Sequence, residues 1–271
     1  MAILRKIKNL LRPARVVTAK VSYLAPNNSL EDKRIVVTGG TKGIGYAIAK
    51  RLTEEGAKVL ITGRNKSELE KVSQELGCYA LSLDLTQIES FDSFVNQAIQ
   101  ELGGIDCLVN NAGVSLHESS YKAVSPQGFD LQISTNMRGP FFLTQKVMSH
   151  MEQNAVKGNI LFISSETGDT VDCRPYGWTK AAINSLVQGL AYYHIKNGIR
   201  VNAIAPGVTA TAMTGFNPES NLNCSYNPNG RVYLPEEIAE VAVFLLSDVS
   251  NCISGQIITC NNGKTINARW K

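Results

Sequence analysis

The sequence lacks the features of a membrane, secreted or metal-binding protein. No apolar run reaches the roughly 18 residues of a membrane span, and the N-terminus has no uninterrupted apolar core of a secretory signal. The six cysteines include no C-x-x-C pair, and the three histidines have no metal-ligand spacing. We therefore expect free thiols, no metal site and a cytoplasmic protein.

Low-complexity linkers, internal repeats and charge blocks are also missing. The 271 residues are 44% hydrophobic and 18% charged, which is typical of a globular protein with a sizeable core and excludes disordered and fibrous classes. We predict an N-terminal arm over residues 1–30 and a single domain over residues 31–271.

The arm contains no Asp or Glu. The formal net charge of +4 falls to −2 once the six Lys and Arg residues of positions 1–30 are set aside. The basicity therefore belongs to the arm, and we expect no nucleic-acid partner for the domain.

Apolar and basic residues of the arm fall on different faces of a helix, which Pro13 would interrupt. One interpretation is an arm that packs on a neighbouring subunit or stays flexible. The other is a membrane-surface anchor or an organelle transit sequence, which would make the protein peripherally membrane-associated or imported. The apolar face holds Ile3, Ile7, Leu10, Leu11 and Ala14, and the basic face holds Arg5, Lys8, Arg12 and Arg15.

From residue 34 onward, short runs rich in β-branched residues alternate with helical patterns. This alternation predicts an α/β fold, a single doubly wound Rossmann-type domain of about seven parallel strands with helices on both faces. The helical pattern is weakest between residues 114 and 135. We predict strands at 34–38, 58–62, 79–83, 105–110, 159–164, 200–205 and 256–260, and helices at 43–55, 66–76, 87–102, 136–153, 176–197 and 235–247.

A glycine-rich turn, T-G-G-T-K-G-I-G at residues 38–45, follows the first predicted strand and opens a helix. Gly39 allows a sharp turn, Gly43 lets backbone N–H groups approach a pyrophosphate, and Gly45 lets the helix pack closely on the sheet. The G-x-x-x-G-x-G spacing differs from the G-x-G-x-x-G dehydrogenase fingerprint, but its position between strand and helix predicts nucleotide binding rather than a plain turn.

The second predicted strand ends at Thr62-Gly63-Arg64, where an NAD site would carry an acidic residue for the adenosine ribose. No acid stands there. Arg64, and Lys42 in the turn, can instead pair with a 2′-phosphate, which favours NADP(H) over NAD(H). The alternative is that both are solvated surface cations.

Tyr176 and Lys180 lie four residues apart at the start of a predicted helix and share one face. A phenol has a pKa near 10, so donating a proton near neutral pH calls for a pKa lower by roughly 3, or about 4 kcal/mol. An adjacent ammonium and a nicotinamide cation can lower it. Tyr46/Lys50 and Tyr192/Lys196 share this spacing, but only Tyr176 follows a strand that ends in two hydroxyls, Ser164 and Ser165.

With these motifs in order, residues 31–266 resemble the short-chain dehydrogenase/reductase family, in its NADPH-preferring division near 3-oxoacyl-(acyl-carrier-protein) reductases. The markers are the turn at 38–45, Asp84-Leu85, N-N-A-G at 110–113, Asn136, Ser165, Tyr176 with Lys180, and Pro206-Gly207 followed by Thr209.

The resemblance implies roles for these residues. Tyr176 would be the general acid or base, Ser165 would polarise the substrate oxygen, Lys180 would bind the nicotinamide ribose, and Asn136 would hold a water in a proton relay to Lys180. The cofactor site implied by the resemblance and by the motifs above comprises Thr38, Gly39, Thr41, Lys42, Gly43, Ile44, Gly45, Arg64, Asp84, Leu85, Asn111, Ala112, Gly113, Tyr176, Lys180, Pro206, Gly207 and Thr209.

Two segments depart from the family pattern. Ser165 to Tyr176 spans eleven positions, about two fewer than the family pattern, and we choose Ser165 over Ser164 because it stands three before Gly168. The expected substrate lid, at about 208–234, is rich in Asn and shows no helical period, which predicts an irregular lid and favours a small polar substrate over a long acyl thioester. Cys173 and Trp178 flank Tyr176 and either touch substrate or pack.

The sequence thus predicts an NADP(H)-dependent oxidoreductase that transfers a hydride between nicotinamide and a carbonyl or alcohol carbon. The alternative is an NADP(H)-binding sensor or scaffold with little turnover that uses its basic arm for a partner or membrane. The strand predicted before Asn262-Gly263 serves subunit packing in relatives, so we expect a homotetramer or a homodimer.

Overall fold

The computed structural model describes residues 15–23 and 28–266. The predicted apolar face of the arm, Ile3 to Ala14, lies outside them. One sheet of parallel strands has the order β3-β2-β1-β4-β5-β6-β7, which confirms the predicted doubly wound Rossmann-type fold. The strands are β1 (Arg34–Val37), β2 (Lys58–Gly63), β3 (Tyr79–Ser82), β4 (Cys107–Asn110), β5 (Asn159–Ile163), β6 (Arg200–Pro206) and β7 (Ile257–Cys260).

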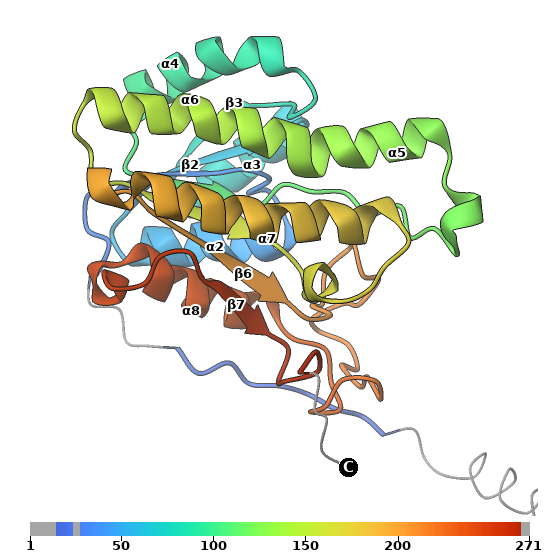
Figure 1. Cartoon of the computed structure of the whole chain (residues 1–271). Helices are drawn as coiled ribbons and strands as arrows, with labels where there is room; N and C mark the ends of the chain where they lie inside the picture. Colours follow the sequence, from blue (N-terminus) through green and yellow to red (C-terminus); the bar gives the residue numbers. More distant parts are fainter. Residues whose placement is uncertain (1–14, 24–27, 267–271) are drawn as a thin grey trace, which may run out of the picture.

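Helices cover both faces of the sheet (Figure 1). In β1, Ile35 and Val37 point into one apolar cluster and Val36 points into the other, because successive strand residues face opposite sides. The first cluster contains α2 (Gly43–Glu54), α3 (Lys66–Leu76) and α8 (Pro235–Leu246), and the second contains α4 (Phe91–Leu102), α6 (Gly139–Gln153) and α7 (Pro175–His194).

The helix predicted to begin at residue 136 begins earlier. A further helix, α5 (Pro126–Ile133), runs through a π-helical segment, Ser134–Arg138, into α6. Ser125 caps α5 by accepting a hydrogen bond from the Gly128 N–H at 3.1 Å, and proline stands at the first helical position. The apolar pattern does not reveal this start, because α5 buries Gly128 and Gln132 and exposes Phe129 and Leu131.

Residues 208–234 form no α-helix, as the sequence predicted. The segment is tied together by backbone hydrogen bonds, from Ala210 to Tyr233 at 2.8 Å and from Val232 to Leu222 at 2.9 Å. It buries an apolar cluster of its own, formed by Ala210, Leu222, Cys224, Val232 and Leu234. We call residues 208–234 the lid.

Residues 15–23, which we call the strap, are extended and lie against the lid of the same chain (Figure 1). The Leu222 N–H donates to the Val17 carbonyl at 3.0 Å, and the Val17 N–H donates to Asn221 Oδ1 at 2.9 Å. Ala19 and Val21 pack on the lid cluster. This part of the predicted arm thus packs its partly buried residues Ala19 and Val21 on its own chain.

We predict that deleting residues 1–23 loosens the lid. The Leu222 amide loses its acceptor, and the apolar cluster of the lid loses its contacts with the strap. Hydrogen exchange at Leu222 should therefore become faster by about tenfold or more. Exchange of the β6 amides serves as the internal control. Unchanged protection at Leu222 would show that the strap does not hold the lid.

Candidate active site

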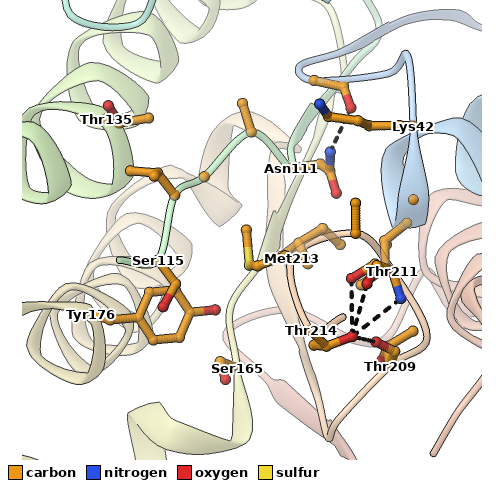
Figure 2. Close-up of a pocket in the computed structure, with 18 of the residues that line it drawn as sticks. Lys42, Asn111, Ser115, Thr135, Ser165, Tyr176, Thr209, Thr211, Met213 and Thr214 are labelled. Atoms are coloured by element: carbon orange, nitrogen blue, oxygen red, sulfur yellow. Dashed lines mark hydrogen bonds between the residues drawn. The ribbon is translucent and has the colours of Figure 1, made fainter. Parts of the chain in front are cut away.

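A cavity of about 740 Å³ opens at the carboxyl edge of the sheet (Figure 2). Its walls are the segments that follow strands β1 to β6, together with the start of α7 and part of the lid. β1 and β4 are neighbours whose following helices α2 and α6 cover opposite faces. This is the topological switch point, where open parallel sheets bind their ligands.

The turn after β1 has the backbone that its glycines predict. Gly39 and Gly43 have φ of +66° and +57°, which residues with a side chain rarely adopt. A β-carbon on Gly39 would lie 3.0 Å from the Ala112 Cα, and one on Gly45 would collide with the Gly39 carbonyl. The glycines thus allow α2 to begin directly against the turn, with its N-terminal N–H groups facing the cavity edge.

Thr38 and Asn111 join the exits of β1 and β4. The buried Thr38 hydroxyl donates to the Val109 carbonyl at 3.2 Å and accepts from the N–H groups of Asn111 and Ala112 at 3.0 and 3.1 Å. The Asn111 amide donates to the carbonyls of Thr38 and Gly39 at 2.9 and 3.0 Å. These bonds fix the turn relative to the next strand.

Three predicted site residues do not line the cavity: Thr38, Gly45 and Asn136. Thr38 and Gly45 are buried behind the turn, where they shape it. The other predicted positions all line the cavity, namely Gly39, Thr41, Lys42, Gly43, Ile44, Arg64, Asp84, Leu85, Asn111, Ala112, Gly113, Ser165, Tyr176, Lys180, Pro206, Gly207 and Thr209.

Asn136 lies in the π-helical segment and holds the neighbouring strand exit. Its Oδ1 accepts from the Val114 N–H at 2.8 Å, and its Nδ2 donates to the Val114 carbonyl at 2.8 Å and to Thr179 Oγ1 at 3.3 Å. The side chain thereby positions the Val114 backbone.

Tyr176 and Lys180 lie one turn apart at the start of α7, as predicted. The Lys180 Nζ is 5.6 Å from the centroid of the Tyr176 ring and donates to the Ile163 carbonyl at 2.8 Å. Ser165 lies near the phenol in the same cavity (Figure 2). The Ser164 hydroxyl is instead bonded to Asn184 Oδ1 at 2.6 Å, which leaves Ser165 as the serine beside Tyr176.

Burial controls the ionisation of this pair. Burial lowers the pKa of Lys180 to about 8, and burial raises the pKa of Tyr176, against a smaller lowering by the Ser165 side chain. In the chain alone, burial therefore outweighs the effect of the Ser165 side chain on the pKa of the phenol. The physical reason is that removal from water destabilises the phenolate by more than the nearby groups stabilise it.

At the end of the cavity near α3, Arg64 and Lys42 are exposed cations on the wall. The sequence analysis missed Glu68, which lines the same end and accepts a hydrogen bond from the Thr41 hydroxyl at 3.1 Å. A signal was present in N-x-x-E at Asn65–Glu68, because a cap residue followed by Glu three positions later places that Glu in the first turn of a helix.

The lid was predicted to lie at the opposite, substrate end of the cavity, but the individual residues there were missed, because the 114–135 segment that builds the rest of this end is weakly patterned. His117 contacts the Met213 carbonyl at 2.7 Å and thus joins this loop to the lid. Cys173 and Trp178 line a separate shallow apolar groove with Phe129 instead. Ser115, His117, Glu118, Leu131, Thr135, Glu166, Asp172, Arg174 and Met213 complete this end.

Within residues 15–23 and 28–266, no group of three His, Cys, Asp or Glu side chains is placed to hold a metal ion. In the same part of the chain, no helix combines the length and the apolar character needed to cross a membrane.

Comparison with known proteins agrees with this geometry. Residues 39–265 match the family model described as Enoyl-(Acyl carrier protein) reductase. An uncharacterised oxidoreductase of Staphylococcus aureus is 35% identical over 228 residues, which are 82% of this chain and 94% of that protein. Another from Mycobacterium bovis is 33% identical over 245 residues, which are 88% of this chain and 98% of that protein.

Among solved structures, the 3-ketoacyl-(acyl-carrier-protein) reductase of Brucella melitensis, crystallised with NADH, matches with a TM-score of 0.81 at 30% identity. The match covers 87% of this chain and 99% of that one. By its fold, its ordered motifs and these relatives, the chain belongs to the short-chain dehydrogenase/reductase family of oxidoreductases.

Proposed function

We propose that the protein reduces a carbonyl group, or oxidises the corresponding alcohol, with NADP(H) as the hydride carrier. The observation that carries the proposal is the placement of Tyr176, Ser165 and Lys180 in one cavity with the glycine turn. A proton donor and a hydroxyl that can hold the substrate oxygen thus face the space where a nicotinamide would end.

The chain's residues fit such a cofactor. The turn at Gly39 and Gly43 leaves room for a pyrophosphate where side chains would intrude. Asn111 to Gly113 would line its middle, Lys180 would bind the nicotinamide ribose, and Pro206 to Thr209 would flank the carboxamide. When bound, the nicotinamide supplies or accepts the hydride.

Tyr176 would donate the proton to the substrate oxygen during reduction. The phenol carries its proton at neutral pH, so a proton is available to the substrate oxygen in the reductive direction, and the charges of Lys180 and of the bound nicotinamide would favour its release. Ser165 would hold the substrate oxygen by a hydrogen bond. Asn136 serves as a positioning residue, since it fixes the Val114 backbone beside the site.

Arg64 and Lys42 support NADP(H) as the preferred cofactor, because both are cations at the end of the cavity where the adenosine 2′-phosphate would lie.

The side chains at the substrate end of the cavity support a small polar substrate. Hydroxyl and charged side chains such as Ser115, Thr135, Glu118 and Arg174 lie there, whereas a long acyl chain needs a continuous apolar lining.

We predict that Tyr176→Phe abolishes turnover but not cofactor binding. The substitution removes only the donated proton, so NADPH oxidation with a reducible carbonyl should fall by a factor of about 10² or more, while NADPH affinity changes little. Loss of nicotinamide absorbance measures the first quantity and fluorescence titration the second.

The matched control is Tyr192→Phe, which alters the exposed tyrosine of the Tyr192/Lys196 pair on the same helix. It should retain wild-type activity. Equal activity of Tyr176→Phe and Tyr192→Phe would contradict the assigned role, and NADPH binding by the wild type without turnover on any carbonyl would favour the sensor alternative.

We predict that NADPH affinity weakens above a pH of about 8, where the buried Lys180 loses its proton. The neutral amine no longer attracts the anionic cofactor, so Kd should rise by up to about tenfold per pH unit. Lys180→Arg keeps its charge in this range, and its Kd should stay flat. The same rise of Kd in the arginine variant would assign the titration to another group.

A further inference from the structure

We propose that Glu68 is a second determinant of cofactor choice, whose carboxylate opposes a 2′-phosphate and allows the protein to accept NAD(H) as well as NADP(H). The inference rests on the proposed function, because it concerns the adenosine end of the same cavity. The expectation drawn from Arg64 and Lys42 alone is different, because these two cations favour NADP(H) and include no group that repels the 2′-phosphate.

Glu68 is held against the phosphate-binding turn rather than extended into solvent. It comes from the first turn of α3, is partly buried and lines the cavity. Thr41 of the turn donates its hydroxyl to Glu68 Oε2 at 3.1 Å. One hydrogen bond thus connects the carboxylate to the loop that would hold the cofactor phosphates.

Local packing fixes this position. Asn65 caps α3 by accepting from the Glu68 N–H at 3.2 Å and from the Ser67 hydroxyl at 2.8 Å, which sets the backbone of the first turn. A β-carbon on Gly63 would stand 3.2 Å from Thr41 Cγ2 and 3.6 Å from Leu69 Cδ2. The glycine at the end of β2 therefore lets the turn and α3 come close enough for the Thr41–Glu68 contact.

The Glu68 carboxylate can still accept hydrogen bonds from a ligand. An ionised carboxylate offers about four acceptor positions, of which Thr41 occupies one. Within the described residues, Glu68 forms no ion pair with Arg64 or Lys42, although all three line the same cavity. Its charge is therefore not neutralised by a direct contact with either cation.

The two charge types at this end recognise different cofactors. Arg64 and Lys42 attract a 2′-phosphate. A carboxylate accepts hydrogen bonds from the ribose hydroxyls of NAD(H) and repels a phosphate at the same place. In an NAD site of this fold that acid stands at the end of the second strand, whereas here Gly63-Arg64 occupies the strand end and the acid comes from the following helix. The net preference is set by the balance between Glu68 and the two cations.

Binding of adenosine fragments tests this inference without any turnover. Calorimetry on the full chain would give the Kd of adenosine 2′,5′-bisphosphate and of adenosine 5′-monophosphate for the wild type, Glu68→Gln and Glu70→Gln. Glu70 is the matched control, since it lies on the same helix, is exposed and does not line the cavity. Thermal unfolding of each variant verifies that it is folded.

We expect Glu68→Gln to increase the preference for the bisphosphate over the monophosphate by about tenfold, because repulsion of the phosphate and charged binding of the hydroxyls are both lost. Glu70→Gln should change the ratio by less than about twofold. Arg64→Ala should move it in the opposite direction.

A ratio in Glu68→Gln equal to that in Glu70→Gln would overturn the inference. The proposed NADP(H) preference fails separately, if the wild type binds the monophosphate more tightly than the bisphosphate. In that case a tenfold shift in Glu68→Gln still supports the role of Glu68 and indicates that the carboxylate outweighs the cations.

Discussion

The contact between the exits of β1 and β4 is the constraint on which the site depends. Thr38 and Asn111 bond the two strand ends together, and Gly45 packs directly on the Gly39 carbonyl. These contacts place the N-terminus of α2 at the cavity edge and hold the 111–113 segment opposite the glycine turn. A side chain at Gly45 would push α2 away and remove the pocket for a pyrophosphate.

Burial then determines the chemistry available at the other side of the same edge. Lys180 is a buried ammonium whose Nζ is held by the Ile163 carbonyl, and burial lowers its pKa to about 8. Tyr176 is a buried phenol whose pKa is raised. At neutral pH both groups carry their protons, so under the proposed function the site would offer a cation to an anionic cofactor and a neutral acid to a developing alkoxide. The same rigid edge supports both because it is made of parallel strands that end together.

Parts of the structure that depend on local sequence were predictable. The β-branched runs predicted the strands, and the ordered motifs, through the family resemblance, predicted that the glycine turn, Tyr176 and Lys180 belong to one site, as the cavity shows. Features that depend on tertiary packing were not. Asn136 was predicted as a site residue, but its hydrogen bonds to Val114 depend on a π-helical segment that no sequence pattern indicated.

The same limit explains the strap and Glu68. Residues 15–23 show alternating apolar positions only weakly, and their partner, the lid, begins almost 200 positions further along the chain, so no local pattern could join them. Glu68 lies in an ordinary capping pattern, and its place in the cavity follows only from how closely α3 approaches the turn.

We would first measure the transfer of deuterium to a carbonyl from NADPH that carries deuterium at both C4 positions of the nicotinamide, so that either face can deliver the label. The labelled cofactor would be incubated with the protein and a panel of small polar ketones and acyl thioesters, and the products examined by mass spectrometry. The account predicts one deuterium on the new carbinol carbon of a polar ketone, and none when Tyr176→Phe is used. NADPH that binds tightly but delivers no deuterium to any carbonyl would contradict it.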